Sequence, residues 1–528
     1  MSIGAEMQTA ESAGVAAIET VRPARADLDR FFLSGIAWTS VVTWLGQIVS
    51  WGSTLVVVHY LVPTDYGLVG MALLYLGIVQ MASELGLGAA VVRYRELTDD
   101  QIGQFNALSV IAGACGVLLS MAVAIPMGHF FREPRLPLVV VVMSFAFFIA
   151  GFRIVPQALM QKRLEFRKLA LIEGTQSLIG AVCTLIMAVT GFGYWTLAFG
   201  MVITSAVYSV LIVANTRTGF RRPQFSAIRQ PFTFSSHMLI TRFAWYGYDN
   251  ADFAVIGRVL GTQALGAYTL GWTLSGMAVE KITALIGRVT PAFFSAVQTD
   301  FAELRRYLLV LTEGLALITF PASIGLALTA KEVVRVALGE KWAVAIVPLQ
   351  LLAVLATIKS VSPLIPQVLA AIGEARTNMR ISLMTLVVLP TSFFFATRWG
   401  IAGVAMAWLV LGPVMLLPLM IKAFRLIEMP ASQYLRALWP ATSACIVMAV
   451  AVLFVDKVFL AQASLGVALV VKVLAGAISY VAALFALHSR RISVIRRSIP
   501  ALRKKSPAPP AQAEPDPVPA ATARVVTV

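Results

Sequence analysis

The chain has 528 residues, of which 59% are apolar and 13% are charged, against about 25% charged residues in soluble domains. Its mean hydropathy is +0.82. A soluble fold cannot hide that much apolar surface, so the composition excludes a soluble multidomain protein and predicts a polytopic membrane protein. The net charge of +16 would suit a protein that binds nucleic acid. Membrane proteins, however, collect lysine and arginine in their cytoplasmic loops, and the positions of the charges decide between the two readings.

Apolar windows of about 20 residues predict fourteen membrane helices. They lie near residues 35–61, 66–92, 105–127, 137–159, 170–190, 193–215, 233–258, 264–290, 307–329, 342–370, 381–397, 400–421, 437–455 and 463–487. An even number places both termini on one side of the membrane. The larger share of the 42 lysines and arginines falls in segments on that same side, with dense clusters at 162–168, 217–229 and 490–505. The positive-inside rule therefore predicts that both termini are cytoplasmic, and this explanation of the charge argues against nucleic acid as a partner.

An internal repeat divides the predicted helices into two sets of six. The stretch Tyr66-Gly-Leu-Val-Gly-Met resembles Leu265-Gly-Ala-Tyr-Thr-Leu, 199 residues later. Because six helices separate the copies, both halves would insert in the same orientation, which is the parallel type of repeat found in transporters. The predicted fold is an all-α polytopic membrane protein with two six-helix lobes and two further C-terminal helices. The predicted divisions are a cytoplasmic N-terminal arm at 1–32, lobes at 33–230 and 231–425, a helix pair at 426–489, and a basic, then Pro/Ala-rich disordered cytoplasmic tail at 490–528.

The sequence offers no features of an enzyme. No nucleophile–base set, no P-loop lysine motif and no large outer loop is visible. The three cysteines and four histidines lack metal-ligand spacing. We therefore expect a non-enzymatic protein without cofactor or metal. A helical bundle with a purely structural role is the alternative, but so many spans with little mass outside the membrane favour transport.

Ionisable residues inside predicted spans are the candidates for a functional site, because each costs about 2.5–3.5 kcal/mol on insertion scales. Four basic residues are divided between the two lobes and would make a central cavity cationic, suited to a diphosphate or an acidic sugar. They are Arg153, Arg242, Lys281 and Lys359. Four acidic residues would either bind a coupling ion or pair helices; they are Glu84, Asp249, Asp252 and Glu280. A fifth basic residue, Lys472, lies outside the repeats and is expected to pair or snorkel.

Several stretches in order along the chain resemble a known family. They are Glu96-Leu-Thr-Asp-Asp-Gln, Leu164-Glu-Phe-Arg-Lys-Leu-Ala, Gly191-Phe-Gly-Tyr-Trp, Tyr248-Asp-Asn-Ala-Asp, Ile256-Gly-Arg-Val-Leu-Gly, Gly266-Ala-Tyr, Pro291-Ala-Phe-Phe-Ser and Gly339-Glu-Lys-Trp. Over about residues 33–425 the chain resembles the polysaccharide transporter family, the Wzx-type oligosaccharide flippases of the MOP exporter superfamily. The likeness is greatest to the branch linked to colanic acid and other exopolysaccharides.

The resemblance implies two lobes around a cationic lumen and a flippase for undecaprenyl-diphosphate-linked oligosaccharides, acting before polymerisation by alternating access. It implies a lipid-linked oligosaccharide and membrane lipids as partners, with polysaccharide polymerase or export machinery as a further one. A cation-coupled multidrug extruder of the same superfamily is the main alternative. The predicted first span, 35–61, contains no Asp or Glu, which counts against it. A peptidoglycan-precursor flippase and an assembly role in an export complex are weaker alternatives.

Overall fold

The computed structural model describes residues 46, 49–83, 88, 91, 97–163, 165–222, 236–287, 290–460 and 462–504. Throughout these ranges the regular elements are helices, and residues 49–60 form the first long helical stretch. The principal helices that follow are α3 (Pro63–Ser83), α5 (Asp99–Phe131), α6 (Leu136–Lys162), α7 (Phe166–Val189), α8 (Trp195–Asn215), α10 (Ser236–Asp249), α11 (Ala251–Val259), α12 (Gly261–Gly287), α13 (Thr290–Ala296), α14 (Phe301–Val333), α15 (Ile346–Val361), α16 (Leu364–Ala371), α17 (Ala375–Ala396), α18 (Gly400–Leu426), α19 (Ala431–Phe459) and α20 (Leu465–Lys504).

The all-α, polytopic membrane character predicted from composition is confirmed. Ten stretches within the described ranges are long and apolar enough to cross a membrane. One of them, Arg376–Leu426, has 51 residues and contains both α17 and α18, joined by a short 3-10 turn at Thr397–Trp399. The count of fourteen helices stays a prediction, as do the predicted domain limits. The N-terminal arm and residues 505–528 lie outside the described residues.

Local sequence signals explain where several helices begin and end. Thr98 and Gln101 form a capping box at the start of α5, with each side chain bonded to the other residue's backbone N–H. Asp300 caps α14 by accepting from the backbone N–H groups of Ala302 and Glu303. Pro363 separates α15 from α16, as expected for a residue that cannot donate a helical hydrogen bond.

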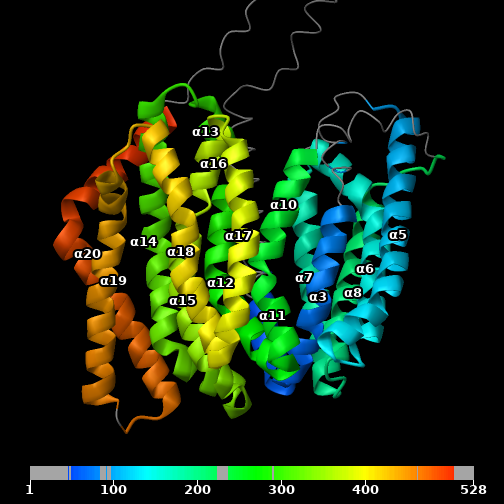
Figure 1. Ribbon diagram of the computed structural model, residues 1–528, viewed down its shortest axis with the longest axis horizontal. Coiled ribbons are helices and arrows are strands. Elements are labelled where there is room, and N and C mark those ends of the chain that lie inside the picture. Colours follow the sequence, from blue (N-terminus) through cyan, green and yellow to red (C-terminus); the bar gives the residue numbers. More distant parts are fainter. Residues whose placement is uncertain are drawn as a thin grey trace, which may run out of the picture.

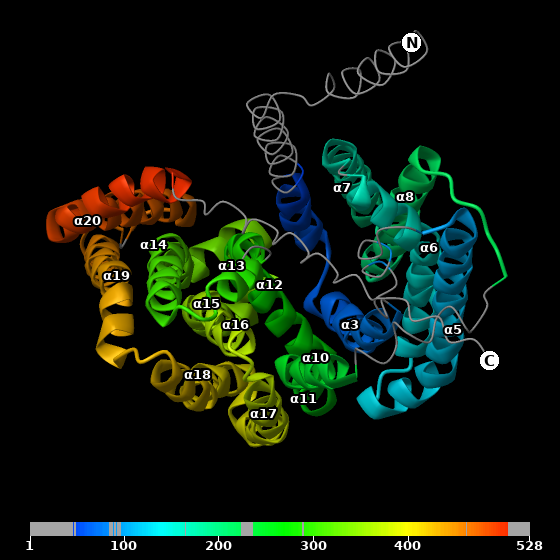
Figure 2. The ribbon, with the colours of Figure 1, turned by 90° about the horizontal axis from the view of Figure 1, so that it is seen from above.

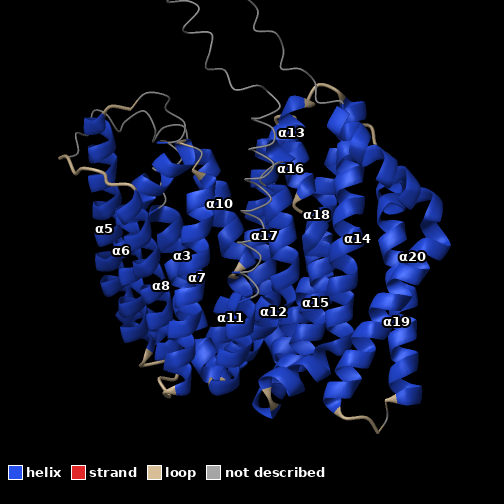
Figure 3. Ribbon diagram, turned by 180° about the vertical axis from the view of Figure 1, so that it is seen from behind, coloured by secondary structure: helices blue, strands red, loops and turns tan. Residues whose placement is uncertain are grey.

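The helices form two groups that meet near one end of the molecule. Helices α3 and α5–α8 lie on one side in Figure 1, and α10–α18 lie on the other, with α19 and α20 at the outer edge of the second group. The view from above in Figure 2 and the rear view in Figure 3 show the same arrangement. We call these sets the first bundle, the second bundle and the last pair. One large cluster of buried apolar side chains joins the bundles, running from Met71 and Val140 to Tyr268 and Trp408.

The closest contact between the bundles is the crossing of α3 with α12. A methyl group at Gly67 would overlap the carbonyl oxygen of Thr262, and one at Gly266 would overlap the carbonyl oxygen of Pro63. The two contacts are reciprocal, because Thr262 follows Pro63 by the same 199 residues that separate Gly266 from Gly67. Glycine is required at both positions because the backbones touch there. A reciprocal contact of this kind is what a two-fold axis produces.

The last pair is attached to the second bundle through a buried group of charges. The ammonium of Lys472 in α20 lies 2.8 Å from Glu332 in α14 and 2.7 Å from Asp456 in α19. The side chains of Lys472 and Glu332 are each only 5% exposed. An apolar cavity of about 390 Å³ lies beside them between α14, α19 and α20. Lys472 therefore pairs with acidic residues, as expected from the sequence.

Helix α20 bends in its C-terminal half. His488 has non-helical backbone angles (φ −131°, ψ 23°), and its Nε2 lies 2.8 Å from the hydroxyl oxygen of Ser443 in α19. Beyond this bend the basic stretch continues as helix to Lys504, and Figure 2 shows α20 lying across the edge of the molecule in the view from above.

A contact between Lys422 and Glu374 fixes the beginning of α17. The ammonium of Lys422 in α18 donates to the Glu374 carboxylate at 2.7 Å, and the Thr377 hydroxyl donates to the same oxygen. These two hydrogen bonds lower the pKa of Glu374 below its ordinary value. Glu374 therefore stays ionised and holds the α16–α17 turn against α18.

Alanine at either position of the glycine crossing should destabilise the protein. In Gly67→Ala and Gly266→Ala the added methyl meets backbone, which cannot rotate away, so we expect a lowered Tm of the detergent-solubilised protein for both. The control is Gly314→Ala in α14, where a methyl group meets nothing within 4 Å, and its Tm should stay the same or rise. An unchanged Tm in both crossing variants would contradict the close backbone contact.

Removal of the Lys472 charge should also destabilise the protein. Lys472→Met leaves Glu332 buried without its cation, a loss of about 3–5 kcal/mol for breaking a buried ion pair. Lys457→Met in α19 removes an exposed lysine and serves as the control. Adding Glu332→Gln to Lys472→Met should recover part of the lost Tm. A double variant no more stable than the single one would show that the buried charge is not the cause.

Candidate functional site

The structure brings some of the eight candidate charges into contact and leaves others apart. Asp249, Asp252 and Lys359 belong to one cluster in the second bundle, whereas Arg153 lies in the first bundle. Arg242 and Lys281 are helical residues of α10 and α12, but their side chains lie outside the described part of the chain. Glu280 is an exposed residue of α12, and Glu84 lies outside the described residues.

The cluster in the second bundle is built around the ammonium of Lys359 on α15. The ammonium lies 2.7 Å from the Oδ1 atom of Asp249 at the end of α10. It also lies 4.2 Å from the ring centroid of Trp272 on α12 and 4.8 Å from that of Trp408 on α18. Both distances are typical of cation–π contacts. Four helices thus surround one positive charge, whose side chain remains 34% exposed.

Asp252 forms the floor of this cluster. Its side chain is fully buried, and its Oδ2 atom accepts hydrogen bonds from the Tyr268 hydroxyl at 2.7 Å and the Trp408 indole N–H at 2.8 Å. Its Oδ1 atom accepts from the backbone N–H of Phe253 at 2.9 Å. Asp252 therefore connects α11 to α12 and α18, and it fixes the Trp408 ring against which Lys359 lies.

The cluster lies beside the boundary between the two bundles. Tyr246, one turn before Asp249 on α10, donates its hydroxyl to the carbonyl oxygen of Leu74 on α3 at 2.9 Å. Thr269, one turn before Trp272 on α12, lies against Gly70 on α3, where a methyl carbon would come within 3.1 Å of the Thr269 hydroxyl. Asp249 and Trp272 therefore each lie within one helical turn of a residue that contacts the first bundle.

A related cluster occurs in the first bundle around Arg153 on α6. The guanidinium lies 4.7 Å from the ring centroid of Tyr208 on α8 and donates to the Gln157 side chain at 3.0 Å. The Tyr208 hydroxyl lies 3.3 Å from the Glu173 carboxylate on α7. Each bundle thus holds a cation that rests on an aromatic ring with an acidic group nearby.

The positions of the two clusters in the sequence are related. Trp408 follows Tyr208 by 200 residues, close to the repeat spacing of 199. Lys359 follows Arg153 by 206 residues, which differs from the repeat by two helical turns and so keeps the same helix face. The aromatic partners Tyr208 and Trp408 were not singled out from the sequence. A search for aromatic residues that allowed one residue of shift from the spacing of 199 would have found both.

The two clusters are suited to holding an anion rather than a metal. Arginine and lysine donate to phosphate or carboxylate groups, and the aromatic faces keep their charges oriented without neutralising them. In the ranges with described side chains, no three His, Cys, Asp or Glu residues come together as a metal site would require.

A comparison with known protein families shows to which family the chain belongs. The model of a family described as "Polysaccharide biosynthesis protein" matches residues 56–347, more than half of the sequence. The chain belongs to this family. This membership confirms the resemblance found in the sequence, to the Wzx-type polysaccharide flippases of the MOP superfamily, and identifies a transporter rather than an enzyme.

Individual relatives agree with that assignment. The chain is 24% identical over 423 residues to the lipopolysaccharide biosynthesis protein WzxC of Escherichia coli (strain K12), covering 77% of this chain and 84% of that protein. The fold is similar to that of the lipid II flippase MurJ in an inward closed conformation, with a TM-score of 0.65, 12% identity, and coverage of 86% and 100% of the two chains. It is also similar to an inward-facing multidrug resistance MATE transporter of the MOP superfamily, with a TM-score of 0.56, 16% identity, and coverage of 72% and 94%. These similarities establish a MOP-type fold.

Loss of the Asp252 carboxylate should loosen the cluster. Asp252→Ala leaves the Tyr268 hydroxyl and the Trp408 N–H without an acceptor, at about 1–3 kcal/mol for each buried group. We expect a lower Tm and altered tryptophan fluorescence. Asp252→Asn retains one oxygen acceptor in the same position and should be affected less. Equal effects of the two substitutions would argue against a role for the hydrogen bonds.

Proposed function

We propose that this protein is a flippase that moves undecaprenyl-diphosphate-linked oligosaccharide repeat units from the cytoplasmic to the periplasmic leaflet, for exopolysaccharide or lipopolysaccharide biosynthesis. The observation that carries this proposal is the pair of cation–aromatic–carboxylate clusters, one in each bundle, within a family of polysaccharide biosynthesis proteins. The names of WzxC and the lipid II flippase MurJ support a lipid-linked glycan as the substrate class.

The physical requirement of such a reaction matches the fold. The diphosphate and sugars of the substrate are polar, and dragging them unassisted through hydrocarbon would cost many kcal/mol. A cavity between the two bundles would shelter the polar head, while the polyprenyl chain remained in lipid. In this proposal Arg153 and Lys359 contact the diphosphate, with Arg242 and Lys281 as further contacts. Trp272, half-buried beside Lys359, offers a ring face on which a sugar can stack.

The proposal includes two six-helix lobes, 33–230 and 231–425, related by a parallel repeat, followed by the pair at 426–489. The reciprocal contact of Gly67 with Thr262 and of Gly266 with Pro63 supports this repeat, since both pairs have the spacing of 199 residues. Gly70 supports it further, because its neighbour across the crossing, Thr269, is its own equivalent in the second copy. Such self-contact is expected for a residue on a two-fold axis.

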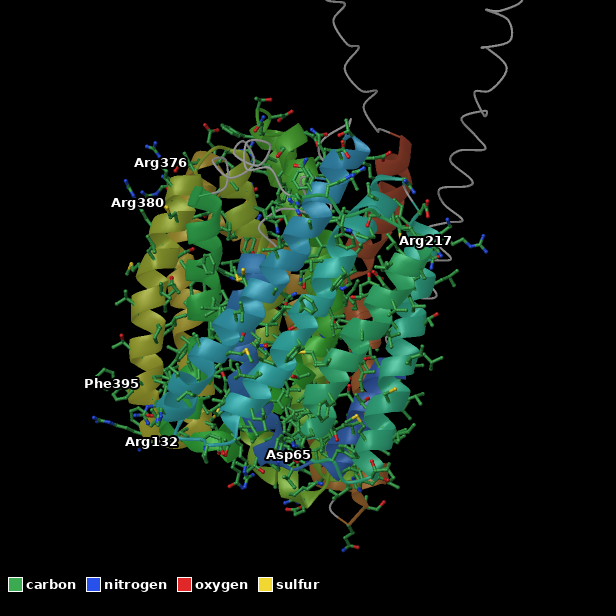
Figure 4. The ribbon with its side chains drawn as sticks, turned by 90° about the vertical axis from the view of Figure 1, so that its right-hand side faces the viewer. Asp65, Arg132, Arg217, Arg376, Arg380 and Phe395 are labelled. Carbon is green, nitrogen blue, oxygen red and sulfur yellow. The ribbon has the colours of Figure 1, made fainter. Side chains whose placement is uncertain are left out.

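We assign the end that carries Arg217, Arg376 and Arg380 to the cytoplasm of a cell with this protein in its inner membrane. Figure 4 shows these three residues at one end of the bundle, with Asp65, Arg132 and Phe395 at the opposite end. The positive-inside rule favours the first end as cytoplasmic, and both termini would lie on that side. The α3–α12 crossing begins near Pro63, at the same end as Asp65, so the outer face would be closed in this conformation.

Alternating access then follows from a separation of α3 and α12. The substrate head would enter from the cytoplasmic side between the bundles and reach Arg153 and Lys359. Parting of the glycine crossing would open the outer face. The proposed mechanism uses no cofactor.

Loss of either cation should block transport in cells. In a deletion strain that expresses Lys359→Met or Arg153→Met, we expect lipid-linked repeat units to accumulate and surface polymer to fall. The loss of one charge-assisted contact of about 1.5–3 kcal/mol corresponds to a flux lowered by about tenfold to a hundredfold. Mass spectrometry of lipid extracts, with the polymer quantified in parallel, measures both quantities.

Lys331→Met, which removes an exposed lysine near the end of α14, is the control and should support normal export. Normal lipid intermediates and normal polymer in the deletion strain, together with new sensitivity to cationic drugs, would contradict the proposal. That result would favour a multidrug extruder.

A further inference from the structure

The ammonium of Lys359 is surrounded by groups that attract a positive charge with different strengths. The rings of Trp272 and Trp408 lie 4.2 and 4.8 Å away and supply only cation–π attraction. Asp249 supplies a full negative charge at 2.7 Å. Both charged side chains keep some exposure, 34% for Lys359 and 18% for Asp249, so a third group can reach the pair.

We propose that Asp249 is a built-in competitor that occupies Lys359 until a multiply charged anion, such as a diphosphate, displaces it. Asp249 would thereby raise the intrinsic affinity that an anion needs in order to bind, so that weakly bound, singly charged anions are rejected. This inference rests on the proposed function, because it takes Lys359 as a contact for the anionic group of the substrate.

The backbone at Asp249 suits an exchangeable partner. Asp249 is the last residue of α10, and Asn250 separates α10 from α11 with φ −119° and ψ 7°. The Asn250 side-chain amide donates to the carbonyl oxygen of Tyr246 at 3.0 Å and so satisfies part of the open end of α10. The Asp249 side chain therefore sits at a junction between helices, and its carboxylate, which contacts Lys359 through Oδ1, can be released by rotation of the side chain alone.

The other acidic group of the cluster does not compete in the same way. Both oxygens of Asp252 already accept hydrogen bonds, from Tyr268, Trp408 and the backbone of Phe253. Trp408 stands between Asp252 and Lys359, since the same ring donates to the carboxylate and faces the ammonium. Asp252 thus keeps the Trp408 ring in position. Asp249 is the partner of Lys359 that an incoming anion must replace.

Charge decides which anions succeed. A carboxylate carries one negative charge and a diphosphate carries more than one, so the Coulomb attraction to Lys359 is larger for the diphosphate at the same distance. A singly charged sugar acid gains no such advantage over Asp249. The wild-type site would therefore bind a diphosphate and reject single carboxylates. The competing group belongs to the protein itself, so an anion that binds Lys359 more weakly than Asp249 does is rejected.

The test uses the purified full-length protein in detergent, with inorganic pyrophosphate and glucuronate as probes and binding followed by calorimetry and tryptophan fluorescence. Asp249→Asn should bind pyrophosphate about tenfold or more tightly than wild type, because its competitor is gone. Its affinity for glucuronate should rise by a similar factor, because the same competitor is removed for both probes. Asp249→Ser provides a second neutral variant should Asp249→Asn fold poorly. Lys359→Met should bind pyrophosphate about tenfold or more weakly than wild type, because it loses one charge-assisted contact. Glu303→Gln removes one exposed negative charge elsewhere and should bind as wild type does.

An unchanged or weakened affinity for pyrophosphate in both neutral variants would overturn the inference, as would the absence of pyrophosphate binding in every variant. Neither result depends on the lipid profile of cells. If Lys359→Met blocks export in cells but purified Asp249→Asn binds pyrophosphate as wild type does, the proposed function stands and the role of Asp249 as a competitor is wrong. Normal export without the protein would remove the proposed function itself.

Discussion

The structure depends on one constraint: a charged side chain inside a membrane protein needs partners from the protein. Lys472 satisfies this constraint completely, with two carboxylates within 2.8 Å and a side chain 5% exposed, and it therefore holds the last pair of helices in place. Lys359 satisfies it differently. One carboxylate and two indole rings surround it, yet a third of its side chain stays exposed. A charge that is partnered but still reachable is suited to binding an anion, whereas a sealed one is suited to stability.

The same constraint explains why the two bundles contain similar arrangements. Arg153 rests on Tyr208 as Lys359 rests on Trp408, and the aromatic residues lie 200 positions apart in the sequence. The glycine crossing of α3 and α12 is consistent with the proposed repeat, because Gly67 meets Thr262 and Gly266 meets Pro63, and both pairs have the same spacing of 199 residues. In the proposed alternating-access mechanism this tight crossing must part before the outer face can open.

Much of this arrangement could be predicted from the sequence, and the rest could not, for identifiable reasons. Hydropathy places the helices because lipid demands long apolar runs, and depth within a span marks Arg153 and Lys359 as unusual. The side chains that contact these charges could not be predicted in this way. Asp249 and Lys359 are 110 residues apart, and Asp252 and Trp408 are 156 apart. Spacing along one helix says nothing about which face of another helix lies opposite, so Asp249 and Asp252, three residues apart on neighbouring helical segments, look equivalent in the sequence. The structure gives them separate partners.

The most direct measurement of the central claim is the sidedness of a lipid-linked oligosaccharide in proteoliposomes that contain the purified protein. A membrane-impermeant glycan-cleaving enzyme added outside reports the fraction of substrate in the outer leaflet. If the protein is a flippase, the inner pool that is protected in protein-free liposomes becomes cleavable when wild-type protein is present and stays protected with Lys359→Met. An inner pool that remains protected with correctly folded wild-type protein, across imposed proton and sodium gradients of either direction, would contradict it.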